Sequence, residues 1–436
     1  MKIVINNGFL IDPKNNIEDF FNLEIVDGKV TKISKDILFG DYEINAKDLY
    51  VTPGFVDIHM HEDYMKDGKI KINIFEKMLK MGVTTAIGGN CGIGPNNISE
   101  YLKIYEKNPL IKFKMLLPHK ILREYIGEND RYKNLEPSQV EKMFKYGKKL
   151  IKENNLLGIS FGIEYIPGID SNELITLAKL GENKIIAVHL RKDGKDVISS
   201  CNEFFEIEKY VKAHFQISHI GSMAGYGQMD DLLDYIQTKV DDGIDVGCDC
   251  YPYTAFSTHI GSAVFDDNYV ENHSGKYENL EVLEGKFKGK RCSFELFNYL
   301  RENFPNTLVA GHLMLTDEIK KAMKNKNVVI ASDGLLGEDG NGHPRAVGTF
   351  PRFLKNYVIN EKLMTLSEGI SKITNQPAEM YKLDAGHLSL GANADITIFS
   401  PNILKDNSTF GHLVSPSGIK YVLINGKIIL KDGEIL

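Results

Sequence analysis

The sequence contains the run Val51-Thr-Pro-Gly-Phe-Val-Asp-Ile-His59-Met-His61, an apolar segment that ends in two histidines one residue apart. On a β-strand, residues i and i+2 project from the same face, so the imidazoles of His59 and His61 would converge on one point. Pro53-Gly54 marks the start of this strand, and the apolar residues that follow suit a strand buried on both faces. Two imidazoles on one wall of a cavity indicate a transition-metal site.

Four later apolar segments also end in a residue that can bind a metal. These segments run from Val83 to Cys91, from Lys184 to His189, from Ala213 to His219 and from Asn327 to Asp333. In a (β/α)8 barrel the active site is built at the carboxyl ends of the strands. The recurrence of such residues at strand ends therefore predicts a barrel of this kind with a metal centre.

Strand-like runs alternate with helical periodicity over the central part of the chain. The predicted helices cover Pro137 to Glu153, Asn202 to Lys212, Asp230 to Val240 and Asp317 to Lys324. This alternation predicts an α/β fold with a parallel sheet, and a closed barrel fits better than a doubly wound sheet. No Gly-x-Gly-x-x-Gly turn follows the first strand, which disfavours a dinucleotide-binding fold.

Both chain ends have the pattern of short strands joined by tight turns. The turn signals are Asn7-Gly8 and Asp27-Gly28 near the start, and Asn425-Gly426 and Asp432-Gly433 near the end. We predict that residues 1–50 and 386–436 form one discontinuous β-sandwich domain. Residues 51–385 would form the (β/α)8 TIM barrel, with an insertion or loop region at 254–306 over its mouth.

The composition excludes several classes of protein. The chain has 436 residues, of which 42% are hydrophobic, enough for one large core and a smaller one. Its net charge of −7 argues against nucleic acid as a partner. No apolar run reaches the roughly 20 residues needed to cross a membrane, and no signal peptide pattern is present, so we expect a cytoplasmic protein. Its five scattered cysteines do not suggest a disulfide framework.

Several motifs together resemble those of a known group of enzymes. They are His59-Met-His61, Gly89-Asn-Cys-Gly92, Gly158-Ile-Ser-Phe-Gly-Ile-Glu-Tyr165, His189-Leu-Arg191, Ile217-Ser-His219, Tyr251-Pro-Tyr253, Ser332-Asp-Gly334 and His343-Pro-Arg345. This set resembles the amidohydrolase superfamily and, within it, the D-aminoacylase family of N-acyl-D-amino-acid deacylases. The resemblance covers nearly the whole chain.

The resemblance implies a set of metal ligands. Cys91, His189 and His219 would hold one Zn²⁺ tightly, and His59, His61 and Asp333 would form a second, weaker site. Asp333 would also be the catalytic base. A thiolate and two imidazoles leave zinc one open position, as a catalytic site requires. Hydantoinases instead use a carboxylated lysine from the fourth strand, and residues 156–162 of this chain contain no lysine.

The resemblance also implies substrate contacts. Arg345 would bind the substrate carboxylate, and Tyr251 and Ser257 would contact the substrate. Arg191 projects to the same side as His189, and it could contact the substrate or form a structural ion pair. The chain departs from the family at Gly221, where the family has a lysine that helps to bind the carboxylate. The anchor would then differ, or the substrate would lack a carboxylate at that place.

The expected activity is zinc-dependent hydrolysis of a linear amide, with an N-acyl-D-amino acid as the small-molecule substrate. The preference for the D form rests on the resemblance alone. The same metal site could instead serve a dipeptidase, a cyclic amidase or a deaminase. A non-catalytic binding protein on this scaffold is disfavoured, because such proteins lose ligands and this chain retains all six candidates.

Overall fold

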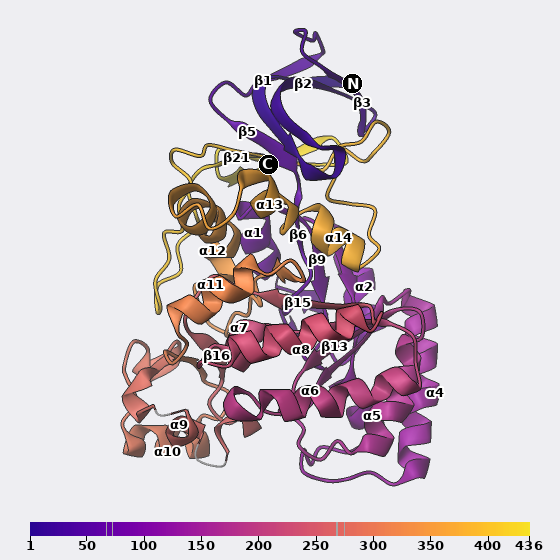
Figure 1. Ribbon diagram of the computed structural model, residues 1–436, viewed down its shortest axis with the longest axis vertical. Coiled ribbons are helices and arrows are strands. Elements are labelled where there is room, and N and C mark those ends of the chain that lie inside the picture. The colour runs from indigo at the N-terminus through magenta and orange to yellow at the C-terminus, as the bar shows by residue number, and fades with distance from the viewer. Residues whose placement is uncertain (67, 72, 267–268, 274) are drawn as a thin grey trace.

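The structure, a computed structural model, describes residues 1–66, 68–71, 73–266, 269–273 and 275–436. Along its longest axis, a β-rich end that carries both chain termini is followed by a larger part in which helices surround central strands (Figure 1). The larger part positions the candidate site, and its strands are described first.

Nine parallel strands form two neighbouring sheets. The first sheet has the order β10-β9-β6 and the second the order β11-β12-β13-β14-β15-β19. Their bounds are β6 (Phe55–Asp57), β9 (Val83–Gly88), β10 (Lys112–Met115), β11 (Leu117–Pro118), β12 (Gly158–Gly162), β13 (Ile185–His189), β14 (His214–Ile217), β15 (Val246–Cys250) and β19 (Val328–Ile330). Most of their residues are buried, as expected of strands covered on both faces.

Backbone hydrogen bonds join the two sheets into a ring. On one side, the N–H of Leu116, between β10 and β11, donates to Gly88 O at 3.0 Å. On the other side, Met60 and Gly334 form a parallel bridge just beyond β6 and β19. There the N–H of Asp333 donates to His59 O at 2.7 Å, which brings the first and last strand ends together. The strands therefore close into a barrel, with β10 and β11 as two parts of one interrupted strand.

Helices follow the barrel strands along the chain. The main ones are α1 (Asn73–Lys80), α2 (Ile98–Tyr105), α3 (His119–Tyr125), α4 (Pro137–Asn154), α5 (Ser171–Ala178), α6 (Val197–Phe205), α8 (Met229–Asp241), α11 (Thr316–Lys324), α12 (Arg345–Arg352), α13 (Leu366–Ser371) and α14 (Asn375–Met380). Helix α4 begins with Pro137, its first turn is closed by a capping box between Glu136 and Gln139, and it ends at Asn155 in the left-handed conformation. These local signals explain why its predicted bounds are close to the observed ones.

The two chain ends meet in one nine-stranded sheet. Its strands are β1 (Lys2–Asp12), β2 (Ile17–Val26), β3 (Lys29–Ser34), β4 (Tyr42–Asn45), β5 (Tyr50–Pro53), β20 (Ile396–Phe399), β21 (Ile419–Ile424), β22 (Lys427–Lys431) and β23 (Glu434–Ile435). Strand β20 pairs antiparallel with β5, which joins the C-terminal strands to the N-terminal ones. This sheet encloses a separate hydrophobic core that includes Ile5, Leu23 and Ile398. The exact domain boundaries stay predictions.

Between β15 and β19 the chain leaves the barrel pattern. Strands β16 (Phe256–His259), β17 (Leu280–Val282) and β18 (Leu308–Gly311) form a separate antiparallel sheet, accompanied by the short helix α9 (Tyr269–Asn272) and by α10 (Phe294–Asn303). The predicted insertion at 254–306 falls in this region, although its residues 267, 268 and 274 lie outside the described part of the chain. In Figure 1, α9 and α10 lie at the end of the molecule remote from the chain termini.

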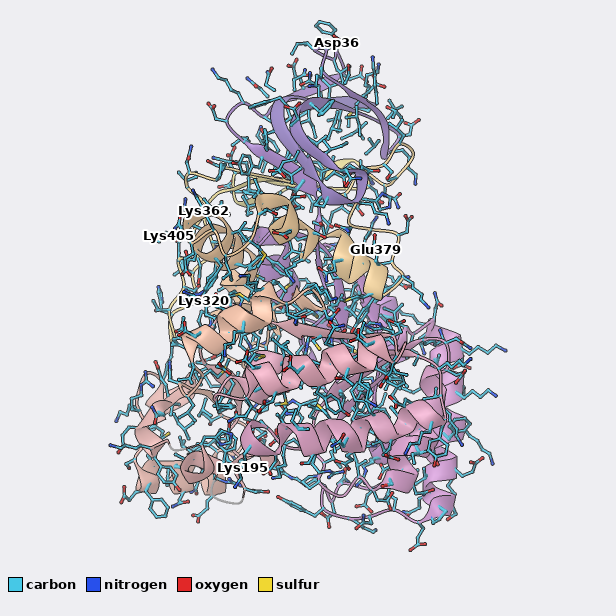
Figure 2. All side chains as sticks on the ribbon, in the orientation of Figure 1. Asp36, Lys195, Lys320, Lys362, Glu379 and Lys405 are labelled. Atoms are coloured by element: carbon cyan, nitrogen blue, oxygen red, sulfur yellow. The ribbon has the colours of Figure 1, made fainter. Side chains whose placement is uncertain are left out.

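Charged side chains mark the outside of the molecule. Figure 2 shows Asp36 at the tip of the terminal sheet and Lys195 near the opposite end. Among the residues that the structure describes, none of the helices combines the length and the apolar character needed to span a bilayer.

Candidate metal centre and substrate cavity

The predicted metal ligands gather at the carboxyl ends of five barrel strands. His59 and His61 follow β6, Cys91 follows β9, His189 is the last residue of β13, His219 follows β14 and Asp333 follows β19. His61 is partly buried, and the other five residues have exposed fractions of 5% or less. The parallel arrangement of the strands is therefore what brings these distant residues to one end of the barrel.

Three of these residues have a left-handed backbone conformation. The φ angles are 52° at Cys91, 36° at His219 and 47° at Asp333. Non-glycine residues rarely adopt positive φ, and such strain is often found where a side chain must be held in a particular direction. Each of the three lies just past the end of its strand, where the turn directs its side chain into the shared cavity.

The side chains form two overlapping groups of potential metal ligands. Sγ of Cys91 lies 3.3 Å from Nε2 of His59 and 3.4 Å from Nε2 of His219. Oδ1 of Asp333 lies 3.1 Å from Nε2 of His61 and 3.4 Å from Nε2 of His59. Within each group the ligand atoms all lie within 4.8 Å of one another, so each group could hold a metal ion. His59 belongs to both groups.

His189 lies beside these groups. Its ring centroid is 4.5 Å from that of His219, and its Nε2 lies 2.8 Å from Oε2 of Glu164. Its Nδ1 is buried and has no hydrogen-bond partner within the described part of the chain. A buried nitrogen without a partner is costly unless it has a ligand, so this atom fits the role of a metal donor.

The other ring nitrogens of the histidines have protein partners. Nδ1 of His59 lies 3.1 Å from Oδ1 of Asp249, and Nδ1 of His219 lies 3.0 Å from Oγ of Ser222. Together with Glu164 on His189, these partners fix the orientation of three of the four rings, as is usual for metal-binding histidines. The sequence analysis did not identify Asp249, Glu164 or Ser222 as site residues. The only sequence signal for Asp249 is a charged residue inside an apolar strand.

The charges in the site favour a bound cation. Burial raises the pKa of Cys91, but the imidazoles of His59 and His219 outweigh burial and hold this pKa well below its ordinary value. Burial likewise raises the pKa of Asp333, but Arg345 and His59 keep it well below the usual range. Burial lowers the pKa of His189, while Cys91 and Glu164 raise it to about 10. The lowered pKa values of Cys91 and Asp333 favour a thiolate and a carboxylate, and the raised pKa of His189 favours a protonated imidazole. A divalent metal could take the place of the imidazole proton and bind these groups as ligands.

The residues predicted to bind substrate lie next to Asp333. Nη1 of Arg345 is 2.9 Å from Oδ2 of Asp333, and Nη2 of Arg345 donates to the backbone oxygen of Ser257 at 3.3 Å. The guanidinium carbon of Arg345 lies 4.6 Å from the ring centroid of Tyr251. Nε of Arg345 and the hydroxyl of Tyr251 are buried, and neither has a partner among the described residues. These two groups are therefore available to a polar ligand.

Arg191 has a different environment. Its Nε donates to Oε2 of Glu203 at 2.7 Å, and its Nη1 and Nη2 donate to the backbone oxygens of Pro167 and Ile169 at 2.8 and 2.6 Å. Within the described chain it does not line either cavity of the site. The structure therefore favours the structural ion pair over the predicted substrate contact.

A side chain at Gly221, where the resembled family has a lysine, would meet two apolar neighbours. A Cβ atom at Gly221 would lie 2.9 Å from Cδ1 of Ile319 and 3.4 Å from Cε of Met314. These apolar side chains occupy the space next to the glycine. Any carboxylate anchor in this site must therefore come from another residue, and Arg345 is the guanidinium that borders both cavities.

Two cavities meet at the candidate centre. The outer cavity has a volume of about 490 Å³ and the inner one about 20 Å³. Five residues line both of them: Tyr165, Ser257, Thr258, Asp333 and Arg345. The predicted base and the predicted carboxylate anchor thus lie at the junction of a large and a small compartment.

Known proteins resemble this chain along most of its length. A profile described as "Amidohydrolase family" matches residues 289–430. The chain is 26% identical to the N-acyl-D-glutamate deacylase of Alcaligenes xylosoxydans xylosoxydans, over 98% of this chain and 93% of that protein. It is 24% identical to the D-aminoacylase of the same organism, over 89% and 86% of the two chains.

Solved structures share the fold over almost the full length. The N-acyl-D-glutamate deacylase from Bordetella bronchiseptica, solved with zinc and a phosphonate inhibitor, superposes with a TM-score of 0.85 at 22% identity and covers 98% of this chain and 96% of its own. A D-aminoacylase with a binuclear metal centre superposes with a TM-score of 0.87 at 22% identity, with 99% and 97% coverage. These structures confirm the predicted fold class. Over nearly its whole length the chain is therefore similar to amidohydrolases, which are metal-dependent hydrolases of carbon–nitrogen bonds, and among them to the deacylases of N-acyl-D-amino acids.

Proposed function

We propose that the protein is a zinc-dependent deacylase that hydrolyses an N-acyl-D-amino acid to a carboxylate and a free D-amino acid. The observation that carries this proposal is the Asp333–Arg345 ion pair beside the Cys91, His59 and His219 cluster, at the junction of the two cavities. This arrangement supports the proposal, because a carboxylate that could act as base and a guanidinium that could bind a carboxylate lie next to potential metal ligands.

Zinc suits the donor set at the site. Cys91, His189 and His219 would hold one ion tightly, and His59, His61 and Asp333 would form a weaker second position. Thiolate and imidazole donors favour zinc among the common divalent metals. When bound, the metal would supply Lewis acidity and a water of lowered pKa.

Asp333 would carry the proton during hydrolysis. Its pKa is held well below the usual range, so its carboxylate is ionised at neutral pH. It could accept the proton of the attacking water if a bound metal lowers the pKa of that water as well. As oxygen adds to the amide carbon and the carbon–nitrogen bond breaks, the same proton would pass to the departing nitrogen. Without that transfer the amine would leave as an amide anion, which is a very poor leaving group.

Arg345, Tyr251 and Ser257 would bind the amino-acid part of the substrate. A guanidinium is the natural partner of a carboxylate. Arg345 and Tyr251 line the same inner cavity, and Nε of Arg345 and the Tyr251 hydroxyl have no partner among the described residues. A linear amide is favoured over a cyclic one because β12 provides no lysine for the carboxylated ligand of hydantoinases. The preference for the D enantiomer rests on the similarity to the deacylases.

Amine release from paired N-acetyl-D- and N-acetyl-L-amino acids by the zinc-replete protein tests the proposal. We expect turnover of the D forms and its loss in Cys91→Ala. Cys201→Ala is the matched control, because Cys201 is also fully buried but its thiol lies outside both ligand groups. Absence of turnover with both enantiomers, in protein that demonstrably binds zinc, would overturn the proposal.

A further inference from the structure

We propose that strand β12 positions the thiolate of Cys91 through two of its residues, Ser160 and Gly162. This inference rests on the metal centre of the proposed function and concerns how one of its ligands is held. No residue of β12, a strand that the structure describes completely, belongs to either group of potential ligands. The strand therefore contributes to the centre through its contacts with the turn that carries Cys91.

This turn has an unfavourable backbone conformation. The φ angle is 52° at Cys91 and 68° at Gly92, which follows it. Glycine adopts positive φ readily, whereas a cysteine stays there only when the surrounding structure holds it. Contacts that fix the turn therefore also fix the direction in which the Cys91 thiolate points.

The hydroxyl of Ser160 bridges the two sides of the turn. It accepts the backbone N–H of Gly92 at 2.9 Å and donates to the backbone oxygen of Gly89. Ser160 is 0% exposed and both glycines are buried, so water has no access to replace the hydroxyl. Without the hydroxyl, one N–H and one carbonyl oxygen next to Cys91 would lose their partner, which is costly inside a protein. The turn would then shift towards other partners.

Gly162 leaves space for the backbone of the same turn. A Cβ atom at Gly162 would lie 2.1 Å from the backbone oxygen of Cys91, and one at Gly92 would lie 2.6 Å from the backbone nitrogen of Gly162. Residues 160 and 162 face the same side of the strand, because strand positions alternate. A backbone oxygen cannot rotate away as the end of a side chain can, so a side chain at residue 162 would displace Cys91.

A displaced turn would affect Cys91 more than its neighbours. Sγ of Cys91 lies 3.3 Å from Nε2 of His59 and 3.4 Å from Nε2 of His219. These two imidazoles are held by Asp249 and Ser222, which do not belong to β12. Metal–ligand distances tolerate deviations of only about 0.2 Å, so even a small shift of the turn would remove the thiolate from the centre. The effect of Ser160 on metal binding should therefore pass through Cys91 alone.

Cobalt(II) binding to the metal-free protein tests the inference. A thiolate bound to cobalt gives a charge-transfer absorption that imidazole and carboxylate ligands do not give. We expect Ser160→Ala to weaken cobalt binding by about 10- to 100-fold and to reduce this absorption at saturating cobalt. Gly162→Ala should have the same two effects. Wild-type affinity and absorption in folded Ser160→Ala would overturn the inference.

Two control variants separate positioning from a general loss of stability. Thr397→Val removes a fully buried hydroxyl that donates to the backbone oxygen of Gly82 at 2.6 Å. Gly168→Ala places a Cβ atom 2.5 Å from the backbone oxygen of Lys133. Both positions lie outside the ligand groups, and both variants should keep the cobalt affinity and absorption of the wild type. Losses equal to those of Ser160→Ala and Gly162→Ala would contradict a specific role of β12.

The double variant provides the sharpest comparison. In the Cys91→Ala background, we expect Ser160→Ala to change cobalt affinity by no more than about 2-fold, because the residue through which it acts is absent. A further loss of about 10-fold would show that Ser160 supports the centre by another route and would overturn the inference. Metal binding is the only readout, so absence of deacylase activity would contradict the proposed function and not the role of β12.

Discussion

The carboxylate of Asp249 holds His59 in place. Its Oδ1 lies 3.1 Å from Nδ1 of His59 and also accepts the backbone N–H of His219 at 2.8 Å, while Oδ2 accepts Nε2 of Gln216 at 2.9 Å. A carboxylate can only accept at these distances, so Nδ1 of His59 carries a proton, and Nε2, which faces Cys91, is the ring nitrogen whose lone pair a metal could take. One buried side chain on β15 thus positions two residues of the candidate metal centre.

We expect Asp249→Asn to weaken zinc binding by about 10- to 100-fold, because the amide no longer fixes the tautomer of His59. Competition with a chromophoric chelator measures this affinity without reference to catalysis. Asp245→Asn is the matched control: Asp245 lies just before β15 and contacts His214 at 2.7 Å, away from the ligand groups. Equal zinc affinity in Asp249→Asn and the wild type would show that Asp249 is not needed to position His59 for metal binding.

Gly221 is the second position at which a substitution is informative. Gly221 lies in the short helix α7 (Ile220–Ala224). In Gly221→Ala the gain in helix propensity, about 1 kcal/mol, opposes a tight contact with the flexible end of Ile319. We therefore expect the free energy of unfolding to stay within about 1 kcal/mol of the wild type in urea denaturation. Gly221→Lys should lose about 1–3 kcal/mol through overpacking and should not lower KM. A lower KM in the lysine variant would mean that the missing cation can be restored there.

The candidate ligands could be predicted because each stands at the end of an apolar strand. Their supporting residues could not. Asp249 is 190 residues from His59, and only closure of the barrel brings their side chains into contact. Arg191 shows the converse limit: its spacing from His189 allowed a substrate contact, but Glu203 and two backbone oxygens occupy its guanidinium.

The turns show where local sequence was sufficient for the fold. Asp27-Gly28 connects β2 to β3 as a two-residue hairpin with positive φ at both positions, as predicted, and Asn425-Gly426 does the same between β21 and β22. The prediction of a hairpin at Asn7-Gly8 is wrong. There β1 continues through a bulge, because its two halves pair with different partners, β4 before the bulge and β5 after it. That choice depends on strands far along the chain.

Arg345→Lys should separate carboxylate binding from the ion pair with Asp333. Lysine keeps a positive charge but cannot form the fork of hydrogen bonds that a guanidinium offers to a carboxylate. We expect kcat/KM for an N-acyl-D-amino acid to fall by about 10- to 100-fold, mainly through KM. For the matching substrate with a carboxamide in place of the carboxylate, the same variant should lose much less of its kcat/KM. Equal losses of kcat/KM with both substrates would mean that Arg345 acts only through its ion pair with Asp333 and does not bind the substrate carboxylate.

Lys372 is a buried cation remote from the metal centre. Its side chain is 5% exposed, and its Nζ donates to the backbone oxygens of Asn325 and Val328, both at 2.6 Å. Burial lowers the pKa of Lys372 from 10.5 to about 8, and the smaller effects of Cys250 and Glu368 oppose this shift. Between pH 8 and 10.5 the unfolded chain therefore binds a proton that the folded protein has lost.

Stability should consequently rise with pH through this window. Below pH 8 both states are protonated and the folded protein bears the full cost of the buried charge, whereas above 10.5 both are neutral and the cost is gone. Between pH 8 and 10.5 we expect the free energy of unfolding of the wild type to rise by about 3 kcal/mol more than that of Lys372→Met. Urea denaturation of both proteins across this pH range measures the difference. Lys47→Met, at an exposed lysine, should keep the wild-type slope. Parallel slopes for Lys372→Met and the wild type would show that the two carbonyl oxygens keep Lys372 charged in the fold.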